Sequence, residues 1–339
     1  MGTARRLASY RSGSGVDPWI DRVIADRYRM LEPLGAGSVG RVYRAEDLAE
    51  GRVVAVKVIG PRPPVEEDPQ WLRRVEALAA AVASLEHPNI ARLLDFGLAD
   101  ESSFFVAMEY LEGRTLEELL VADAPLGFTR QLRIGRQLAR AIASAHAHGL
   151  VHRDLKPSNV MVLAGEEEQV KLLDFGIAGQ PGDAPEDPAA GPQGSPTYMA
   201  PGQARGDGPD PRDDVYSLGV ILYEMACGRP PFEADSAIAV ILMHVEALPK
   251  APRMIDREVP PLLEAAILRA LAKNRLDRFQ TMDEWIEALE AAEAQLEEAG
   301  RFAGDASTLG RSRLHRSFVA VGALTGALFL LYVGLRALT

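Results

Sequence analysis

The most specific segment of this chain is residues 152–159, which read His152-Arg153-Asp154-Leu155-Lys156-Pro157-Ser158-Asn159. A second short segment, Asp174-Phe175-Gly176, follows it. Chance agreement with an established motif at eight ordered positions is negligible. The segment comes after an apolar-periodic stretch at 130–148, which predicts a helix, and before 177–194, whose proline and glycine content predicts a long loop without regular structure.

The predicted elements change in kind near Gly113. Before it, valine-rich and apolar runs predict a small sheet, with one helical stretch at 69–86. After it the signals are mainly helical, at 130–148, 214–227, 235–247, 260–272 and 282–299. A chain of 339 residues is long for one compact core, so the pattern predicts an α+β domain of two lobes with accessory segments.

A glycine cluster lies between two of the predicted strands and reads Gly35-Ala36-Gly37-Ser38-Val39-Gly40. Glycine lets backbone N–H groups approach phosphate oxygens that a side chain would block. A dinucleotide site needs a helix to begin at the glycines, whereas here another strand continues, which favours a hairpin that covers phosphates. Lys57 lies in the next strand, among valines. Alone it is an ordinary surface lysine, but beside this hairpin it can reach α- and β-phosphates.

These motifs together resemble the eukaryotic-like (Hanks-type) protein kinases, and most closely the membrane-tethered bacterial serine/threonine kinases. The resemblance covers about residues 28–289. It implies a bilobal protein-kinase fold, with a β-rich N-lobe over about 28–111 and a helical C-lobe over about 112–289. It also implies that ATP and Mg²⁺ are used to phosphorylate protein substrates.

The resemblance assigns a role to each polar residue of the two segments. Asp154 accepts the proton of the substrate hydroxyl, and Lys156 neutralises charge on the transferring phosphoryl group; a lysine here resembles the serine/threonine class. Asn159 and Asp174 hold magnesium, a hard cation that prefers carboxylate and amide oxygens. The implied nucleotide contacts are Gly35, Ala36, Gly37, Ser38, Val39, Gly40, Val42, Ala55, Lys57, Met108, Glu109, Leu111 and Met161.

Further along, residues 194–201 resemble the segment that docks the protein substrate. Asp214 matches the family position that holds the backbone of the catalytic loop, although a helix N-cap explains it equally well.

Two carboxylates of the family pattern are missing. Leu78 stands where a glutamate usually pairs with the strand lysine. Glu76, the nearest upstream acid, is rotated by about 200° along a helix, so it can replace that partner of Lys57 only if the helix is shifted or the following turn is longer. Gly202 stands where a glutamate usually pairs with the arginine at position 278, so a buried Arg278 needs another partner. Both departures favour an alternative function, a pseudokinase that binds nucleotide and serves as a scaffold at the membrane.

The predicted loop contains no serine, threonine or tyrosine between 177 and 194. Arg153 nevertheless resembles the arginine that captures a phosphorylated loop in regulated kinases. The hypothesis is that Asp183, Glu186 and Asp187 provide fixed charge instead, so that phosphorylation within this loop cannot be the switch.

Composition excludes some other classes. The formal net charge of −11 argues against nucleic acid as a partner, and the single cysteine, Cys227, favours a reducing compartment. Residues 1–27 are predicted to be irregular, and 290–316 to form a connector that precedes a membrane span.

The span predicted at 317–335 is followed only by a short tail at 336–339. Residues 318–335 carry no charge and are long enough, as a helix, to cross about 27 Å. Three arginines precede them, which places the kinase domain in the cytoplasm and the chain in the cell (inner) membrane as a single-pass protein. Gly322 and Gly326 form a GxxxG pattern that indicates a possible homodimer.

Overall fold

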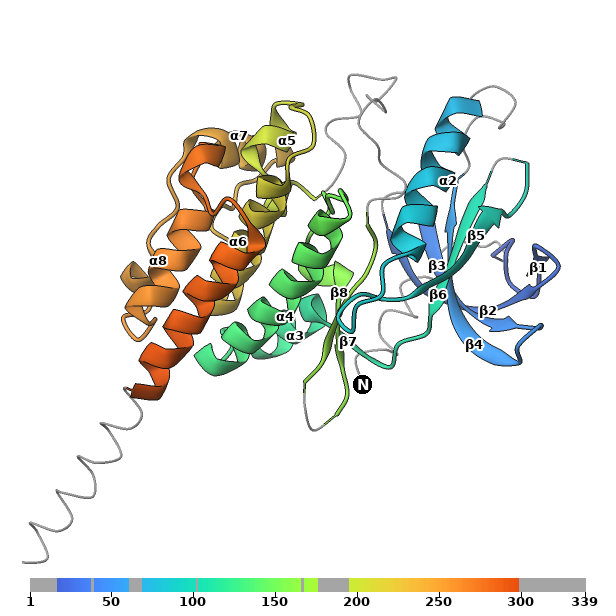
Figure 1. Cartoon of the computed structure of the whole chain (residues 1–339), viewed down its shortest axis with the longest axis horizontal. Helices are drawn as coiled ribbons and strands as arrows, with labels where there is room; N and C mark the ends of the chain where they lie inside the picture. Colours follow the sequence, from blue (N-terminus) through green and yellow to red (C-terminus); the bar gives the residue numbers. More distant parts are fainter. Residues whose placement is uncertain are drawn as a thin grey trace, which may run out of the picture.

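The computed structural model has a small sheet-containing lobe and a larger helical lobe (Figure 1). The structure describes residues 17–37, 40–60, 69–101, 103–165, 168–175 and 195–298. The two-lobed α+β arrangement predicted from the sequence is confirmed in these residues. The long loop predicted at 177–194 lies outside them.

The small lobe is built on a six-stranded antiparallel sheet with the order β1-β2-β3-β4-β6-β5. Its strands are β1 Val23–Ile24, β2 Tyr28–Gly37, β3 Gly40–Asp47, β4 Arg52–Ile59, β5 Leu93–Leu98 and β6 Phe104–Glu109. Helix α2, Pro69–Ala83, lies against β5.

Strand β4 is buried on both faces, and its side chains alternate between two separate cores. Val54, Val56 and Val58 belong to the core of the outer face, whereas Ile59 belongs to the core shared with the helical lobe. Because side chains of a strand alternate, Ala55 and Lys57 lie on the same face as Ile59. The alternation therefore directs Lys57 toward the other lobe.

The segment before the kinase resemblance contributes to this lobe. Residues 1–27 were expected to be irregular, but Val23 and Ile24 pair with β2. Trp19 and Ile20 pack against the core of the outer face. Asp17 accepts hydrogen bonds of 3.0 Å from the Tyr43 hydroxyl, which anchors the start of this segment to β3.

The helical lobe surrounds α6, Pro211–Cys227, which is buried along most of its length. Helix α4, Phe128–Ala147, and helix α8, Pro261–Ala270, lie against it (Figure 1). The remaining elements are β7 Gly113–Thr115, α3 Leu116–Asp123, β8 Val160–Leu163, β9 Val170–Leu172, α5 Pro201–Ala204, α7 Ala237–Glu246 and a helix at 282–298.

The predicted membrane span cannot be compared with the structure, because 317–335 lies outside the described residues. Within the described part of the chain, none of the helices combines the length and the apolar character needed to cross a membrane.

A buried histidine on α7 gives the fold a dependence on pH. The Nδ1 atom of His244 lies 2.8 Å from the Tyr216 hydroxyl, and Lys273 donates a hydrogen bond of 2.8 Å to the His244 carbonyl. The imidazole also contacts the ring of Phe232 edge-on, with 4.9 Å between the centroids. Burial, and then the positive charge of Lys273, lowers the pKa of His244 to about 4.

We expect the free energy of unfolding to fall as the pH falls from 6.5 toward 4. In this interval the unfolded chain binds a proton at His244 that the folded chain excludes, and the loss is at most about 1.4 kcal/mol for each pH unit. Urea unfolding across the interval measures it. The control is His244→Gln, which retains a polar group for Tyr216 but does not titrate. An equally steep decline in this variant would assign the effect to other groups.

Candidate active site

The glycine hairpin is formed by the ends of β2 and β3. Gly37 pairs with Gly40, and the two residues between them, Ser38 and Val39, lie outside the described part of the chain. A Cβ at Gly40 would lie 2.3 Å from the backbone oxygen of Val58, so the close approach of β3 to β4 requires glycine there. A Cβ at Gly35 would meet nothing within 4 Å, so this position borders open space. Ala36 lies between the two and is exposed.

The predicted apolar walls come from neighbouring strands. Val42 on β3 pairs with Lys57 on β4, and Ala55 pairs with Met108 on β6. Met161 lies on β8, in the helical lobe. The register therefore brings Val42, Ala55 and Met108 into one part of the six-stranded sheet, while Met161 belongs to a separate three-stranded sheet of β7, β8 and β9.

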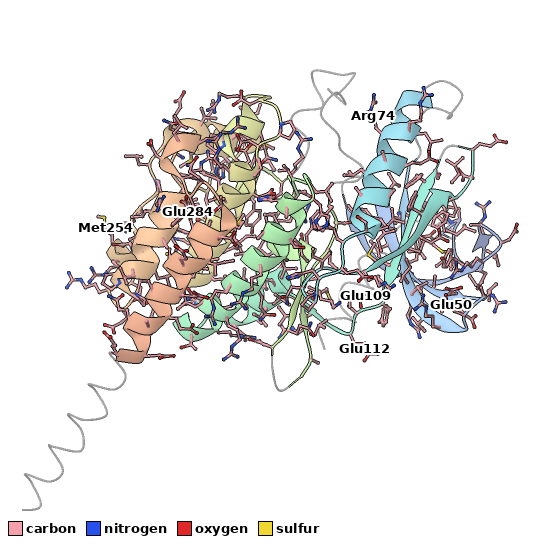
Figure 2. All side chains as sticks on the ribbon, in the orientation of Figure 1. Glu50, Arg74, Glu109, Glu112, Met254 and Glu284 are labelled. Carbon is pink, nitrogen blue, oxygen red and sulfur yellow. The ribbon has the colours of Figure 1, made fainter. Side chains whose placement is uncertain are left out.

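The passage between the lobes begins at Glu109, the last residue of β6, and Leu111 and Glu112 follow it (Figure 2). The Glu109 carboxylate accepts hydrogen bonds from the Arg92 N–H at 2.8 Å and from the Lys171 ammonium at 2.5 Å. Because Lys171 lies on β9 of the helical lobe, this ion pair ties the passage to that lobe. The sequence had not indicated it.

The segment 152–159 gathers its polar side chains around Asp154. The Lys156 ammonium lies 2.5 Å from Oδ2 of Asp154. The Asn159 amide donates hydrogen bonds to the Asp154 carbonyl at 2.7 Å and to its Oδ2 at 3.1 Å. The predicted catalytic pair and one predicted metal ligand are therefore within hydrogen-bonding distance of one another.

Asp214, buried near the start of α6, holds the backbone of this segment. Its carboxylate accepts hydrogen bonds from the N–H groups of His152 at 2.8 Å and Arg153 at 2.9 Å. Arg153 has a φ of 69°, which is costly for a residue with a side chain, so an anchor on its N–H stabilises a strained backbone. The predicted role of Asp214 is confirmed, and the helix N-cap is Asp210 instead.

Asp174 connects the two lobes. The Lys57 ammonium donates to Oδ2 of Asp174 at 2.7 Å, and both side chains are largely buried. Burial, the largest single influence, would raise the pKa of Asp174, but the charge and hydrogen bond of Lys57, together with the charges of His152 and Lys156, outweigh it, so the pKa is lowered and the ionised carboxylate is favoured. Next to it, Phe175 packs on the His152 ring, with 4.8 Å between the centroids.

Helix α2 does not offer Lys57 a carboxylate, either from position 78 or from Glu76. Glu76 is exposed, whereas Leu78 is half-buried and packs against the core shared by the lobes. The side chain at position 78 therefore faces inward as the family pattern requires, but it is apolar. Asp174 is the carboxylate that Lys57 contacts.

Arg278 pairs with a carboxylate from another position, as a buried charge requires. Its side chain is fully buried, and its guanidinium lies 3.1 Å from Oδ1 of Asp213. The same guanidinium donates to the carbonyls of Ala272 at 2.8 Å, Arg212 at 2.8 Å and Lys273 at 3.2 Å. A carboxylate on α6 thus replaces the one that is missing at Gly202, and the buried charge is compensated.

Sequence reasoning did not identify Asp213 or Gln203. Gln203 on α5 donates to the Arg153 carbonyl at 2.7 Å and accepts from the Ala200 N–H at 3.0 Å, which joins the substrate-docking segment to the catalytic segment. The signal for Asp213 was present as two consecutive aspartates at the start of a predicted helix. Such acids usually stabilise the helix dipole, which hid the second role.

A two-lobed fold with a glycine hairpin, a strand lysine joined to a carboxylate of the other lobe, and an aspartate–lysine–asparagine cluster defines a kinase-type phosphotransferase. The model of the protein kinase domain matches residues 28–286. The chain therefore belongs to the protein kinase family.

Two curated relatives are bacterial. The serine/threonine-protein kinase pkn3 of Myxococcus xanthus is 39% identical over 287 residues, which cover 82% of this chain and 52% of the relative. The serine/threonine-protein kinase PrkC of Bacillus subtilis is 36% identical over 265 residues, covering 78% and 40%. The chain thus spans about half or less of these relatives' length.

Among solved structures, the kinase domain of PknI from Mycobacterium tuberculosis matches with a TM-score of 0.65 and 27% identity. The match covers 80% of this chain and 98% of that domain. The similarity therefore extends over a complete kinase domain and agrees with the lobes seen in Figure 1.

Proposed function

We propose that this protein phosphorylates serine and threonine residues of protein substrates, using ATP and Mg²⁺. The observation that carries the proposal is the cluster in which Lys156 and Asn159 both contact Oδ2 of Asp154. A loose phosphoryl-transfer transition state needs a positioned nucleophile and nearby positive charge, and this cluster supplies both. The curated relatives carry the name serine/threonine-protein kinase, which supports the substrate class.

The donor set fits magnesium. Asn159 and Asp174 provide an amide and a carboxylate from two adjacent segments, and the ionised state of Asp174 is favoured by Lys57. Mg²⁺ is usually bound by one or two protein groups, with water and phosphate oxygens completing its shell. When bound, the ion neutralises charge on the phosphates.

The other residues of the site have separate roles in phosphoryl transfer. Asp154 orients the substrate hydroxyl and accepts its proton, while Lys156 offsets charge on the phosphoryl group. Lys57 holds phosphates from the small lobe, and the glycines of the hairpin let its backbone N–H groups approach them. Val42, Ala55 and Met108 supply the apolar surface for the base.

The same proposal includes a membrane anchor at 317–335, with the kinase domain in the cytoplasm and Gly322 and Gly326 at a homodimer seam. It is supported by the uncharged run and by the arginines that precede it. Fractionation of cells that express the full chain, with and without residues 317–335, tests the anchor.

Crosslinking in membranes, with Gly326→Ile for comparison, tests the homodimer seam. An unchanged dimer yield would remove the homodimer.

A second function, a nucleotide-binding scaffold without transfer, is favoured by the inward-facing Leu78. Without a carboxylate there, α2 does not position Lys57.

An assay of transfer separates the two functions. Purified full-length protein is incubated with labelled ATP and Mg²⁺ beside the Lys57→Met variant, which lacks the phosphate-binding charge. We expect label on serine or threonine of the protein itself or of a general protein substrate, and a loss of at least about tenfold in the variant. Nucleotide binding without any transfer by the natural protein would establish the scaffold.

A further inference from the structure

The space beside Gly202 is filled by an arginine. A Cβ built at Gly202 would lie 2.1 Å from Nη2 and 2.7 Å from Cζ of Arg275. Side chains cannot share this volume, so the Arg275 guanidinium occupies the place in which a residue at 202 would begin its side chain. The position of the Arg275 guanidinium therefore depends on the absence of a side chain at Gly202.

The guanidinium of Arg275 is held firmly. It makes a two-pronged ion pair with Asp213, with Nη2 at 2.6 Å from Oδ2 and Nε at 3.1 Å from Oδ1. It also donates to the Gly208 carbonyl at 3.3 Å. Bidentate pairs of this kind are among the stronger and more directional polar contacts in proteins. A change of side-chain conformation that moves Arg275 away from Gly202 would therefore break several of these contacts.

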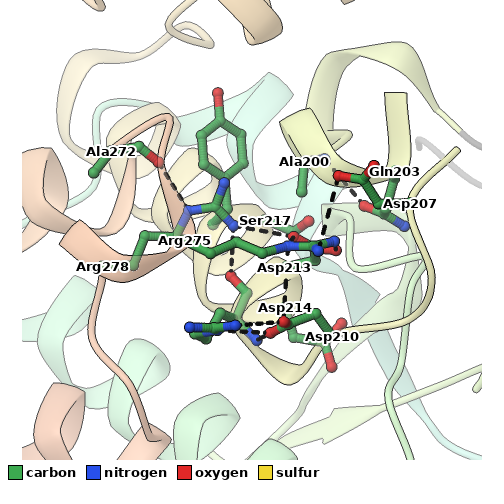
Figure 3. A network of polar contacts seen from close by, with 12 residues as sticks. Ala200, Gln203, Asp207, Asp210, Asp213, Asp214, Ser217, Ala272, Arg275 and Arg278 are labelled. Carbon is green, nitrogen blue, oxygen red and sulfur yellow. Dashed lines mark hydrogen bonds and ion pairs between the residues drawn. The ribbon is translucent and has the colours of Figure 1, made fainter. Parts of the chain in front are cut away.

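Asp213 receives two arginines. Arg278 contacts it from within the core, and Arg275 contacts it from the side of α5 (Figure 3). Arg278 has three backbone carbonyls as further partners, whereas Arg275 has Asp213 as its closest partner and the carboxylates of Asp207 at 3.8 Å and Asp210 at 3.9 Å around it. Loss of Arg275 would thus leave Asp213 paired and the core charge compensated.

A short chain of contacts leads from Arg275 to the catalytic segment. Gly202 belongs to α5, and its carbonyl accepts a hydrogen bond of 2.9 Å from the Asp207 N–H. In the same helix, Gln203 joins the Ala200 N–H to the Arg153 carbonyl. Arg153 directly precedes Asp154. Helix α5 therefore lies between Arg275 and the backbone that carries the catalytic aspartate.

We infer that Arg275 is a positioning residue for the protein substrate: bound by Asp213 and packed against Gly202, it holds α5 and the docking segment 195–201 in register with the catalytic segment. This inference rests on the proposed function. In the family pattern, a carboxylate at position 202 extends from α5 toward the core. In this chain position 202 is glycine, and Arg275 extends toward α5 instead. The distance between the substrate hydroxyl and Asp154 depends on this register, and small displacements at such a site are costly.

The first test is Arg275→Ala. We expect the KM for a protein or peptide substrate to rise by about tenfold or more, while the KM for ATP and the midpoint of unfolding stay close to those of the natural chain. Arg140→Ala is the matched control, because Arg140 is an exposed arginine with an ion pair of 3.6 Å to Glu290. A substrate KM unchanged by Arg275→Ala would overturn the inference.

A second pair of variants tests the shared space. Gly202→Ala alone should raise the substrate KM, because its Cβ displaces Arg275. When Gly202→Ala is added to Arg275→Ala, it should cause no further loss, because the volume is then free. Additive losses, or no loss in Gly202→Ala alone, would contradict the arrangement.

Amide hydrogen exchange gives a readout that does not need activity. We expect the Ala204 N–H, which is bonded to the Ala200 carbonyl within α5, to exchange faster in Arg275→Ala and at an unchanged rate in Arg140→Ala. Equal exchange in all three proteins would overturn the inference. If the natural chain transfers no phosphate, the proposed function fails, while this measurement still decides whether Arg275 holds α5.

Discussion

The Asp154→Asn variant should transfer phosphate about 10²- to 10⁴-fold more slowly than the natural chain, measured as kcat. Asparagine has the shape of aspartate and can still accept a hydrogen bond from Lys156, which lies 2.5 Å away in the natural protein. It cannot take up the proton of a substrate hydroxyl, and it leaves the charge of Lys156 without a counterion. The loss should therefore appear in kcat and leave the KM for ATP nearly unchanged.

The measurement is a steady-state assay with saturating ATP and a protein substrate. Asp123→Asn, at the end of α3, is the control for removal of one negative charge from the same lobe. Unfolding midpoints of both variants should match that of the natural chain. Transfer by Asp154→Asn at more than a tenth of the natural rate would contradict the role of Asp154 as the base.

Replacement of Asp214 by alanine should lower the free energy of unfolding by about 2–6 kcal/mol. The substitution removes the acceptor of two backbone N–H groups, the buried one of His152 and the partly buried one of Arg153, and an unpaired donor costs about 1–3 kcal/mol. It also removes the partner of His146, whose Nε2 lies 2.8 Å from the carboxylate. The positive φ of Arg153 then loses its anchor, so Asp154 is displaced and transfer falls as well.

Urea unfolding of the natural protein and of Asp214→Ala measures the loss. Asp214→Asn is the informative comparison, because its single carbonyl oxygen can accept only part of these hydrogen bonds while the volume is preserved. We expect its stability to lie between those of the other two proteins. A destabilisation of Asp214→Ala below about 1 kcal/mol would show that the catalytic segment holds its conformation without this carboxylate.

The two departures from the family pattern differ in whether other residues compensate for them. The one at Gly202 is compensated within the structure, because Asp213 pairs with the buried Arg278 and Arg275 fills the space beside the glycine. The one at Leu78 is not compensated on α2, and Lys57 contacts Asp174 instead. The missing carboxylate at position 202 therefore no longer supports the scaffold function. Positioning of Lys57 is the feature on which full activity depends.

Local sequence was enough wherever a pattern repeats with the period of one element. The alternating valines of β4 indicated a strand that directs Lys57 to one face, and the helical periods of α4, α6, α7 and α8 located these helices to within a few residues. The segment 152–159 was also informative by itself, because Asp154, Lys156 and Asn159 are so close along the chain that a single turn brings them together.

Partners that are distant along the chain could be decided only by the tertiary structure. Arg278 could have paired with any nearby acid, and only the packing of the segment that follows α8 against the start of α6 selects Asp213. Likewise, the loss of a carboxylate at Gly202 looks like a defect until Arg275 is found in its place. The physical reason is that a periodic pattern reports which face of an element is buried, whereas the choice of an ionic partner depends on distances of a few ångströms between elements, which the pattern does not encode.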